Sequence, residues 1–149
     1  MRGKFTLLIA DDSETDLLLL THAVSELAEE VDLQVTHDGD EVVSYLQGEG
    51  EFSDRERYAL PDLIMLDLQM PRLSGFDVLG WLQGRADCAH IPKIIMSGSN
   101  VEKDVEECYR LGANTFFTKP SSLHELRELM RHIVGYWSRS RRLALNHSC

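Results

Sequence analysis

Four short, largely apolar runs in this sequence each end in polar or charged side chains that could take part in chemistry. The runs and the residues that follow them are Leu7–Ala10 with Asp11 and Asp12, Leu63–Leu66 with Asp67, Ile94–Met96 with Ser97, and Thr115–Thr118 with Lys119. Because the carboxyl ends of parallel strands lie along one edge of an open α/β sheet, we expect these side chains to lie close together. Carboxylates crowded in one place repel each other unless a cation lies among them. The pattern therefore predicts a divalent-metal site that contains a nucleophilic aspartate.

Asp67 is the candidate nucleophile of this site. A carboxylate oxygen can act as a covalent nucleophile, and Mg²⁺ prefers a few carboxylates together with waters and phosphate oxygens. Asp12 and Asp67 can supply that pair of carboxylates, with Asp11 holding metal-bound water. Lys119 can neutralise a phosphoryl oxygen as a point charge, and Ser97 can donate a hydrogen bond to another. Together these groups offer the electrostatic stabilisation that phosphoryl transfer mainly needs.

Each of these residues also has an ordinary structural explanation when it is taken alone. An Asp-Asp pair after a strand is more often a turn and a helix cap, and a serine after an apolar run usually caps a helix. A lone aspartate before Leu-x-Met-Pro is often a loop residue, and Lys-Pro at a strand end is usually a surface turn. Their joint occurrence, each at the carboxyl end of a strand, favours a functional site.

The apolar pattern predicts the elements that position these residues. Apolar or alternating runs indicate strands over residues 5–10, 33–37, 60–67, 91–97 and 114–118. Helical spacing and capping residues indicate five helices, which begin at Ser13, Asp38, about Ser74, Ser99 and Ser122 and end near Leu27, Leu46, Leu82, Gly112 and Trp137. Five strands that alternate with five helices imply an α/β fold in which a parallel sheet is covered on both faces.

Two segments fall outside this alternation. Residues 48–58 (GEGEFSDRERY) are polar and charged, and they predict an extended loop between the second helix and the third strand. Residues 138–149 form a short basic tail, which we expect to be flexible or to extend the last helix. An electrostatic contact of this tail with an acidic partner or a phosphate remains an alternative. The chain thus divides into one domain, residues 1–137, and the tail.

Composition narrows the classes of protein to consider. A chain of 149 residues with 43% hydrophobic and 27% charged residues fits a single globular domain. The formal net charge of −10 argues against nucleic acid or an anionic membrane as the main partner. No apolar run is long enough to span a bilayer, and the start of the chain lacks a signal-peptide core. Three cysteines without motif spacing suit a reducing compartment, so we expect a cytoplasmic protein.

The candidate residues resemble the motifs of the receiver domains of two-component response regulators. The matching elements are Asp11-Asp12, the Asp67-Leu-Gln-Met-Pro71 stretch with Gly75, Ser97-Gly98 and Lys119-Pro120, and the similarity extends from about Phe5 to about Trp137. The resemblance implies a doubly wound, flavodoxin-like (CheY-like) fold of strand order 2-1-3-4-5, with Asp67 phosphorylated by a histidine kinase. It also implies Mg²⁺ bound by Asp12, Asp67 and the backbone carbonyl of Gln69, and a cis bond between Lys119 and Pro120. Ser97 would be the switch hydroxyl and Phe116 the switch aromatic.

Within this family, the GEGEF loop and the Tyr136-Trp137 ending are similar to stand-alone receivers that serve bacterial phytochrome-type histidine kinases. Two positions depart from the commonest family pattern, because Ser97 replaces a more frequent threonine and Gln69 occupies a site often taken by asparagine. Serine keeps the hydroxyl and loses the methyl group, so switching should survive with looser packing. Gln69 and Ser99 lie where the family tunes the lifetime of the phosphate.

The resemblance implies a signalling protein rather than an enzyme, with at most self-catalysed phosphotransfer and autodephosphorylation. Phosphorylation adds charge and acceptor oxygens at one point. We expect Ser97 to move toward the phosphoryl group and Phe116 to fill the space that it leaves. These movements would switch the surface of the fourth helix, fifth strand and fifth helix for partner binding or for homodimer formation.

Other functions fit the sequence less well. A degenerate receiver that acts as a phosphorylation-independent interaction module would be expected to lack the acidic pair, the acceptor or the lysine, and all are present. An aspartate-nucleophile phosphohydrolase would usually need a second aspartate two residues after the first, where this chain has Gln69. No helix-turn-helix pattern follows Trp137, so direct DNA binding is not expected beyond any contact of the basic tail.

Overall fold

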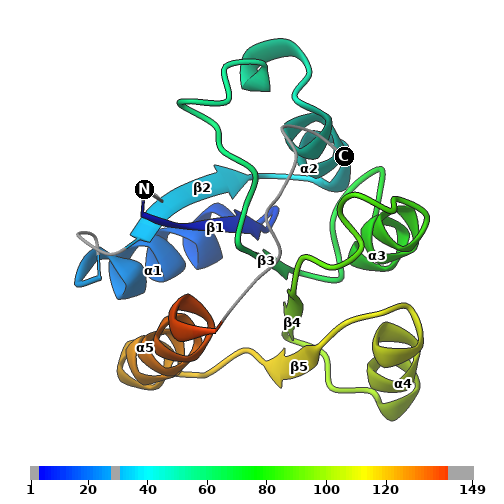
Figure 1. Ribbon diagram of the computed structural model, residues 1–149. Helices are drawn as coiled ribbons and strands as arrows, with labels where there is room; N and C mark the ends of the chain where they lie inside the picture. The colour runs from blue at the N-terminus through cyan, green and yellow to red at the C-terminus, as the bar shows by residue number, and fades with distance from the viewer. Residues whose placement is uncertain (1–3, 28–30, 141–149) are drawn as a thin grey trace.

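The computed structural model describes residues 4–27 and 31–140, and Figure 1 shows their arrangement. The strands are β1 (Phe5–Ala10), β2 (Val31–Thr36), β3 (Leu63–Leu66), β4 (Lys93–Ser97) and β5 (Thr115–Thr118). The helices are α1 (Glu14–Ser25), α2 (Gly39–Gln47), α3 (Gly75–Gln83), α4 (Glu102–Arg110) and α5 (Leu123–Arg139), and a short 3₁₀ helix, η1 (Gly50–Phe52), follows α2. The predicted alternation of five strands with five helices is confirmed.

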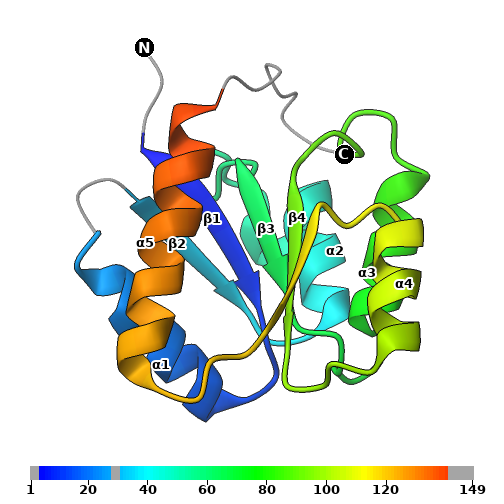
Figure 2. The same cartoon turned by 90° about the horizontal axis from the view of Figure 1, so that it is seen from below.

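The five strands form one parallel sheet in the order β2-β1-β3-β4-β5, as the family resemblance implied. Helices α1 and α5 cover one face of this sheet, and α2, α3 and α4 cover the other (Figures 1 and 2). The direction in which successive strands are added reverses between β1 and β3. In open α/β sheets, ligands bind in the crevice at the carboxyl ends of the strands that flank such a switch point.

An apolar core fills each side of the sheet. Leu7 and Ile9 of β1 pack toward α1 and α5, whereas Leu8 of the same strand packs toward α2 and α3. Residues of β3 alternate in the same way, with Met65 on the first side and Leu66 on the second. Because both faces of the central strands are buried, these strands read as continuous apolar runs in the sequence. Their packing fixes the position of the residues that follow each strand.

Side-chain caps set the start of four helices at the predicted residues. The capping oxygens belong to Ser13, Asp38, Ser74 and Ser122, and each accepts a hydrogen bond from the backbone N–H three residues later. At α3 the capping is reciprocal, because Asp77 also accepts a hydrogen bond from the backbone N–H of Ser74. Such caps satisfy N–H groups that the first turn of a helix leaves without a partner.

The start of α4 differs from the prediction. Val101 occupies the N-cap position of this helix and makes no side-chain capping bond, so the helix start expected at Ser99 was wrong. The Ser99 hydroxyl instead accepts a long hydrogen bond of 3.5 Å from the N–H of Val101. The hydroxyl thus stabilises the turn before the helix, a local alternative to capping that is common for serine.

Strand β3 begins at Leu63, three residues later than predicted. Pro61 has no N–H to donate to a sheet, and the carboxylate of Asp62 accepts a hydrogen bond from the N–H of Thr6 at 2.8 Å. The Asp62 carboxylate therefore accepts a hydrogen bond that a backbone carbonyl would accept if β3 began earlier. β4 likewise begins only at Lys93, after Pro92.

The segment from Gly48 to Tyr58 is packed against the protein rather than extended into solvent. Phe52 is buried, and its ring lies 5.1 Å from that of Tyr45 and 5.2 Å from that of Tyr58 between centroids. The Arg55 guanidinium donates hydrogen bonds to the carbonyls of Tyr45 and Leu46 at the end of α2, each at 2.7 Å. A basic side chain thus satisfies carbonyls that the helix end leaves open. The connection between α2 and β3 was predicted at the right place, but the expectation of an extended loop was wrong.

Helix α5 continues without a break to Arg139, past the domain boundary that we placed at residue 137. The rest of the basic tail, from residue 141 onward, lies outside the described residues. Within the two described ranges, no helix combines the length and the apolar composition needed to cross a membrane.

Candidate functional site

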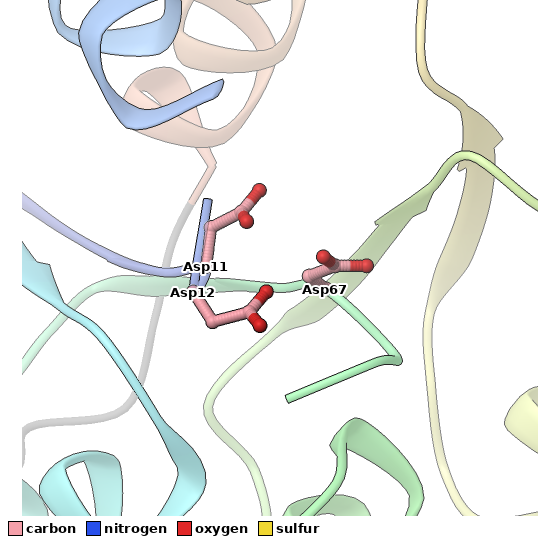
Figure 3. Close-up of side chains that lie close together, drawn as sticks. All are labelled: Asp11, Asp12 and Asp67. Atoms are coloured by element: carbon pink, nitrogen blue, oxygen red, sulfur yellow. The ribbon is translucent and has the colours of Figure 1, made fainter. Parts of the chain in front are cut away.

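Asp11, Asp12 and Asp67 lie together at the switch point of the sheet. Asp11 and Asp12 directly follow β1, and Asp67 directly follows β3. The two strands stay in register up to Ala10 and Leu66, and the N–H of Asp67 donates to the Ala10 carbonyl at 3.0 Å. The two strand ends therefore finish side by side. Figure 3 shows the three side chains around one space between these ends.

The three carboxylates fit a divalent cation. Each offers an oxygen, and these oxygens all lie within 4.8 Å of one another. Asp11 and Asp67 are buried, while Asp12 is exposed and leaves one side of the group open to solvent. Oxygen donors are the ligands that Mg²⁺ and Ca²⁺ prefer, and Mg²⁺ usually keeps several waters. Three carboxylates plus solvent access are therefore a suitable donor set for a hydrated divalent ion.

Lys119 brings a positive charge to the same place from the end of β5. Its N–H donates to the Ser97 carbonyl at 2.8 Å, which holds the segment after β5 against the end of β4. Its Nζ donates to Asp11 Oδ2 at 2.9 Å and to Asp67 Oδ2 at 3.2 Å. The structure thus brings the three predicted carboxylates and the predicted ammonium into one group.

The peptide bond between Lys119 and Pro120 is trans, and the described residues contain no cis peptide bond. The cis bond that the family resemblance implied was therefore wrong for this structure. Trans is the form that a bond before proline favours, by about 0.5–1 kcal/mol, unless its surroundings impose the other.

Asp16 is a fourth carboxylate at the site, and it was not among the predicted site residues. Its Oδ2 accepts a hydrogen bond from Lys119 Nζ at 2.6 Å, which is shorter than the bonds to Asp11 and Asp67. Its place in the first turn of α1, four residues after Asp12, is the only sequence signal that could have indicated this contact. That signal is weak, because acidic residues are common in the first turn of any helix.

The surroundings of Asp67 oppose its negative charge. Burial raises the pKa of its carboxyl above the ordinary value, the Lys119 ammonium lowers it in part, and the Asp11 carboxylate raises it again. Burial alone would lower the pKa of Lys119, but hydrogen bonds to Asp16 and Asp11 and the charge of Asp67 outweigh burial and raise it. Lys119 is therefore firmly charged, and an added cation would relieve the repulsion at Asp67.

Ser97 is buried at the end of β4, next to the group of charges. Its hydroxyl accepts a hydrogen bond from the N–H of Ser99 at 3.2 Å. Ser99 is half-buried and lies in the turn before α4. The hydroxyl of Ser97 thus contacts the segment that leads into α4, while its backbone carbonyl contacts the N–H of Lys119.

Phe116 lies in β5, three residues before Lys119, and its half-buried side chain packs against the core on the α4 side of the sheet. Its backbone N–H donates to the hydroxyl of Tyr109 in α4 at 3.1 Å. Tyr109 was not among the predicted site residues. The hydrogen bond shows that α4 and the open edge of the sheet are joined at the candidate switch residue.

The loop after Asp67 is tightly built. The N–H of Gln69 lies 3.5 Å from Asp67 Oδ1, a long contact, and the side chain of Gln69 is exposed. A Cβ added at Gly75 would lie 2.5 Å from the carbonyl oxygen of Asp67 and 2.8 Å from Leu68 Cα, so only glycine fits there. Arg72 adopts a left-handed conformation at φ 66°. These features fix the backbone that follows Asp67.

Comparison with known proteins decides the family. A sequence model of the response regulator receiver domain matches residues 7–131. The chain belongs to this family. The matched range contains every residue of the site described above, and response regulators of this kind are signalling proteins.

Three relatives are similar over most of their length. Response regulator Rcp1 of Synechocystis sp. is 30% identical over 131 residues, which are 88% of this chain and 87% of that protein. The response regulator RPA3017 in red light signaling of R. palustris has a structure with 30% identity and a TM-score of 0.86, over 95% of this chain and 99% of the other. The phosphorylated cyanobacterial phytochrome response regulator RcpA has 28% identity and a TM-score of 0.85, over the same shares. The predicted family and fold are thus confirmed.

Proposed function

We propose that this receiver accepts a phosphoryl group from a histidine kinase on Asp67 and signals through the surface of α4, β5 and α5. One observation carries the proposal: Asp67 lies within a group of three close carboxylates and receives a hydrogen bond from Lys119. The same constellation argues against a purely phosphorylation-independent interaction module, which would have no use for it.

The phosphotransfer step forms one bond and breaks another. An oxygen of Asp67 attacks the phosphorus of a phosphohistidine, and the O–P bond forms as the P–N bond breaks. The electron pair of that bond leaves with the imidazole nitrogen of the kinase. Lys119 already donates to Asp67 Oδ2, so a small movement lets it donate to a phosphoryl oxygen instead. The chain thereby promotes its own phosphorylation without acting as an enzyme on other substrates.

The cation that fits this chemistry is Mg²⁺, held by Asp11 and Asp12 directly or through water, by Asp67 and by the backbone carbonyl of Gln69. When bound, Mg²⁺ neutralises the charge that develops on the transferred phosphoryl group. The donor set of three close carboxylates supports this assignment. Rcp1 has been solved in a Mn²⁺-bound form, with 29% identity and a TM-score of 0.80, which supports binding of a divalent ion by this chain.

Readout of the phosphate runs through Ser97 and Phe116. The phosphoryl oxygens attract the Ser97 hydroxyl, which gives up its hydrogen bond from the N–H of Ser99. Phe116 moves into the vacated space, and the contact between β5 and Tyr109 of α4 changes with it. The altered α4–β5–α5 surface then binds a partner or a second copy of the chain.

The upstream partner in this proposal is a phytochrome-type histidine kinase. The names of RcpA and RPA3017 link those relatives to phytochrome or red-light signalling, which supports the same link here. The transfer takes place in the cytoplasm, where ATP-dependent kinase domains act. Gln69 and Ser99 tune how long the phosphate survives, because they control where hydrolytic water can lie.

Phosphotransfer from purified kinases tests the proposal. A phytochrome-type histidine kinase and an unrelated histidine kinase are labelled with ATP and mixed with the wild type, Asp67→Asn and the surface control Asp87→Asn, with Mg²⁺. We expect label on the wild type and on Asp87→Asn, none on Asp67→Asn, and faster transfer from the phytochrome-type kinase. Equal label on Asp67→Asn would overturn the acceptor, and faster transfer from the unrelated kinase would overturn the partner.

A further inference from the structure

We propose that Asp16 competes with the phosphoryl group for Lys119 and so sets how strongly the phosphorylated state is stabilised. This inference rests on the proposed function of Asp67 and adds a regulatory residue to that site. Asp16 is a positioning residue in this account, because it acts through Lys119 rather than on the reacting atoms.

The hydrogen bonds of Lys119 Nζ are the first evidence. An ammonium has three N–H donors, and Lys119 uses them on Asp16 at 2.6 Å, Asp11 at 2.9 Å and Asp67 at 3.2 Å. The shortest bond goes to the carboxylate that lies outside the group of three metal-type ligands. A phosphoryl oxygen on Asp67 would therefore have to draw Lys119 away from a strong acceptor.

Asp16 cannot easily follow Lys119 toward the phosphate. Its backbone N–H donates to the Ser13 hydroxyl at 3.2 Å, and the N–H of Ser13 donates to Asp11 Oδ1 at 2.9 Å. The start of α1 is thus tied to the acidic pair, and the Asp16 carboxylate is held on the α1 side of the lysine. Leu20, Met96 and Leu126 line a small cavity together with Asp16 and Lys119.

Charge balance gives the direction of the effect. Three carboxylates, those of Asp11, Asp16 and Asp67, share one ammonium, so each lessens the attraction that Lys119 offers to an anion. Replacing Asp16 by asparagine keeps an oxygen that can accept from Lys119 and removes the negative charge. The variant should therefore bind a phosphoryl group more tightly than the wild type.

Binding of beryllofluoride, a mimic of the phosphoryl group, at saturating Mg²⁺ tests the inference. We expect Asp16→Asn to bind it about two- to fivefold more tightly than the wild type, the range typical of one partly exposed charge pair. Glu14→Gln is the matched control, because Glu14 is an exposed carboxylate in the same helical turn and its removal changes the net charge equally. The control should bind like the wild type.

A double-mutant cycle shows whether the effect passes through Lys119. We expect Asp16→Asn to change the logarithm of the beryllofluoride affinity less than half as much in a Lys119→Gln background as in the wild-type background. An equal change in both backgrounds, or an affinity of Asp16→Asn no tighter than that of Glu14→Gln, would overturn the inference. Failure of the wild type to bind beryllofluoride in an Asp67-dependent way would instead overturn the proposed function.

Mg²⁺ binding alone provides a separate readout. Asp16→Asn should weaken Mg²⁺ binding more than Glu14→Gln does, because Lys119 without its bond to the charged Asp16 neutralises Asp11 and Asp67 more strongly. An excess loss of Mg²⁺ affinity that persists in the Lys119→Gln background would make Asp16 a metal-site residue and contradict its assignment as a competitor for Lys119.

Discussion

The hydroxyl of Tyr109 in α4 accepts a hydrogen bond from the backbone N–H of Phe116 in β5, at 3.1 Å. β5 is the edge strand of the sheet, and no strand among residues 4–27 and 31–140 pairs with its outward N–H groups. A helix side chain thus fills an open position on the edge at the residue that we assign to the switch. A movement of the Phe116 backbone must change or break this bond, so the bond couples α4 to β5.

Substitution of Tyr109 by phenylalanine tests this coupling. The change removes one hydroxyl and leaves the ring, so we expect a loss of about 0.5–1 kcal/mol in the free energy of unfolding, at the low end for a hydrogen bond because Tyr109 is half exposed. Amide exchange at Phe116 should become faster. Tyr136→Phe in α5 is the control, since Tyr136 is largely exposed. Unchanged exchange at Phe116 would show that the bond does not hold β5.

The raised pKa of Asp67 leads to a prediction about stability and pH. The folded protein holds the Asp67 proton to a higher pH than the unfolded chain does. The stabilisation from this proton is present below the ordinary aspartate pKa and is lost as the pH rises through the folded-state pKa. At neutral pH, the ionised carboxylate therefore costs folding free energy when no metal is bound.

We accordingly expect Asp67→Asn to raise the urea midpoint of the metal-free protein at pH 7, and to raise it less when the pH is lowered toward 4. Added Mg²⁺ should stabilise the wild type more than the variant. The exposed Asp87→Asn should show neither effect. A lower midpoint for Asp67→Asn at pH 7 would mean that Lys119 outweighs burial at this carboxylate.

Gly75 allows the loop after Asp67 to close. Because an added Cβ would meet backbone atoms of Asp67 and Leu68 that cannot rotate away, we expect Gly75→Ala to lower the free energy of unfolding by about 1–3 kcal/mol. It should also weaken Mg²⁺ binding by displacing Asp67. Gly80→Ala, in the same helix, is a matched control, because an added Cβ there meets nothing within 4 Å. Equal stability of the two variants would contradict the close packing.

Replacement of Lys119 by methionine should affect two ligands in opposite directions. Removing the ammonium leaves the acidic group less neutralised, so Mg²⁺ should bind more tightly. Beryllofluoride should bind at least about tenfold more weakly, because a charge-assisted hydrogen bond is lost. Titrations of each ligand against wild type and the exposed-lysine control Lys103→Met measure both effects. Parallel changes for the two ligands would show that Lys119 acts only through structure.

The central strands, most helix starts and the main residues of the site could be predicted from local sequence. Strands buried on both faces are nearly all apolar, so β1 and β3 could be located, and the residues that follow them had to share one edge. Ser74 and Ser122 could be identified as caps because the capping bond spans only three residues. Asp11, Asp67 and Lys119 were predicted to meet for the same topological reason.

The features that the sequence did not reveal depend on contacts between distant segments. Asp16 contacts Lys119 across 103 positions of the chain, and its acidic side chain looked like an ordinary first-turn residue. Arg55 looked like part of a solvated loop until the fold placed it at the end of α2. The start of α4 was missed for a local reason instead. The Ser99 hydroxyl could either cap the helix or stabilise the turn before it, and the sequence is compatible with both patterns.

The central claim is that Asp67 is the phosphoacceptor. The most direct measurement treats the protein with acetyl phosphate and Mg²⁺, reduces the acyl phosphate with borohydride, and locates the resulting homoserine by peptide mass spectrometry. We predict conversion at position 67 alone, dependent on Mg²⁺ and absent from Asp67→Asn. Conversion at Asp11, Asp12 or Asp16, or no conversion at any aspartate, would contradict the account.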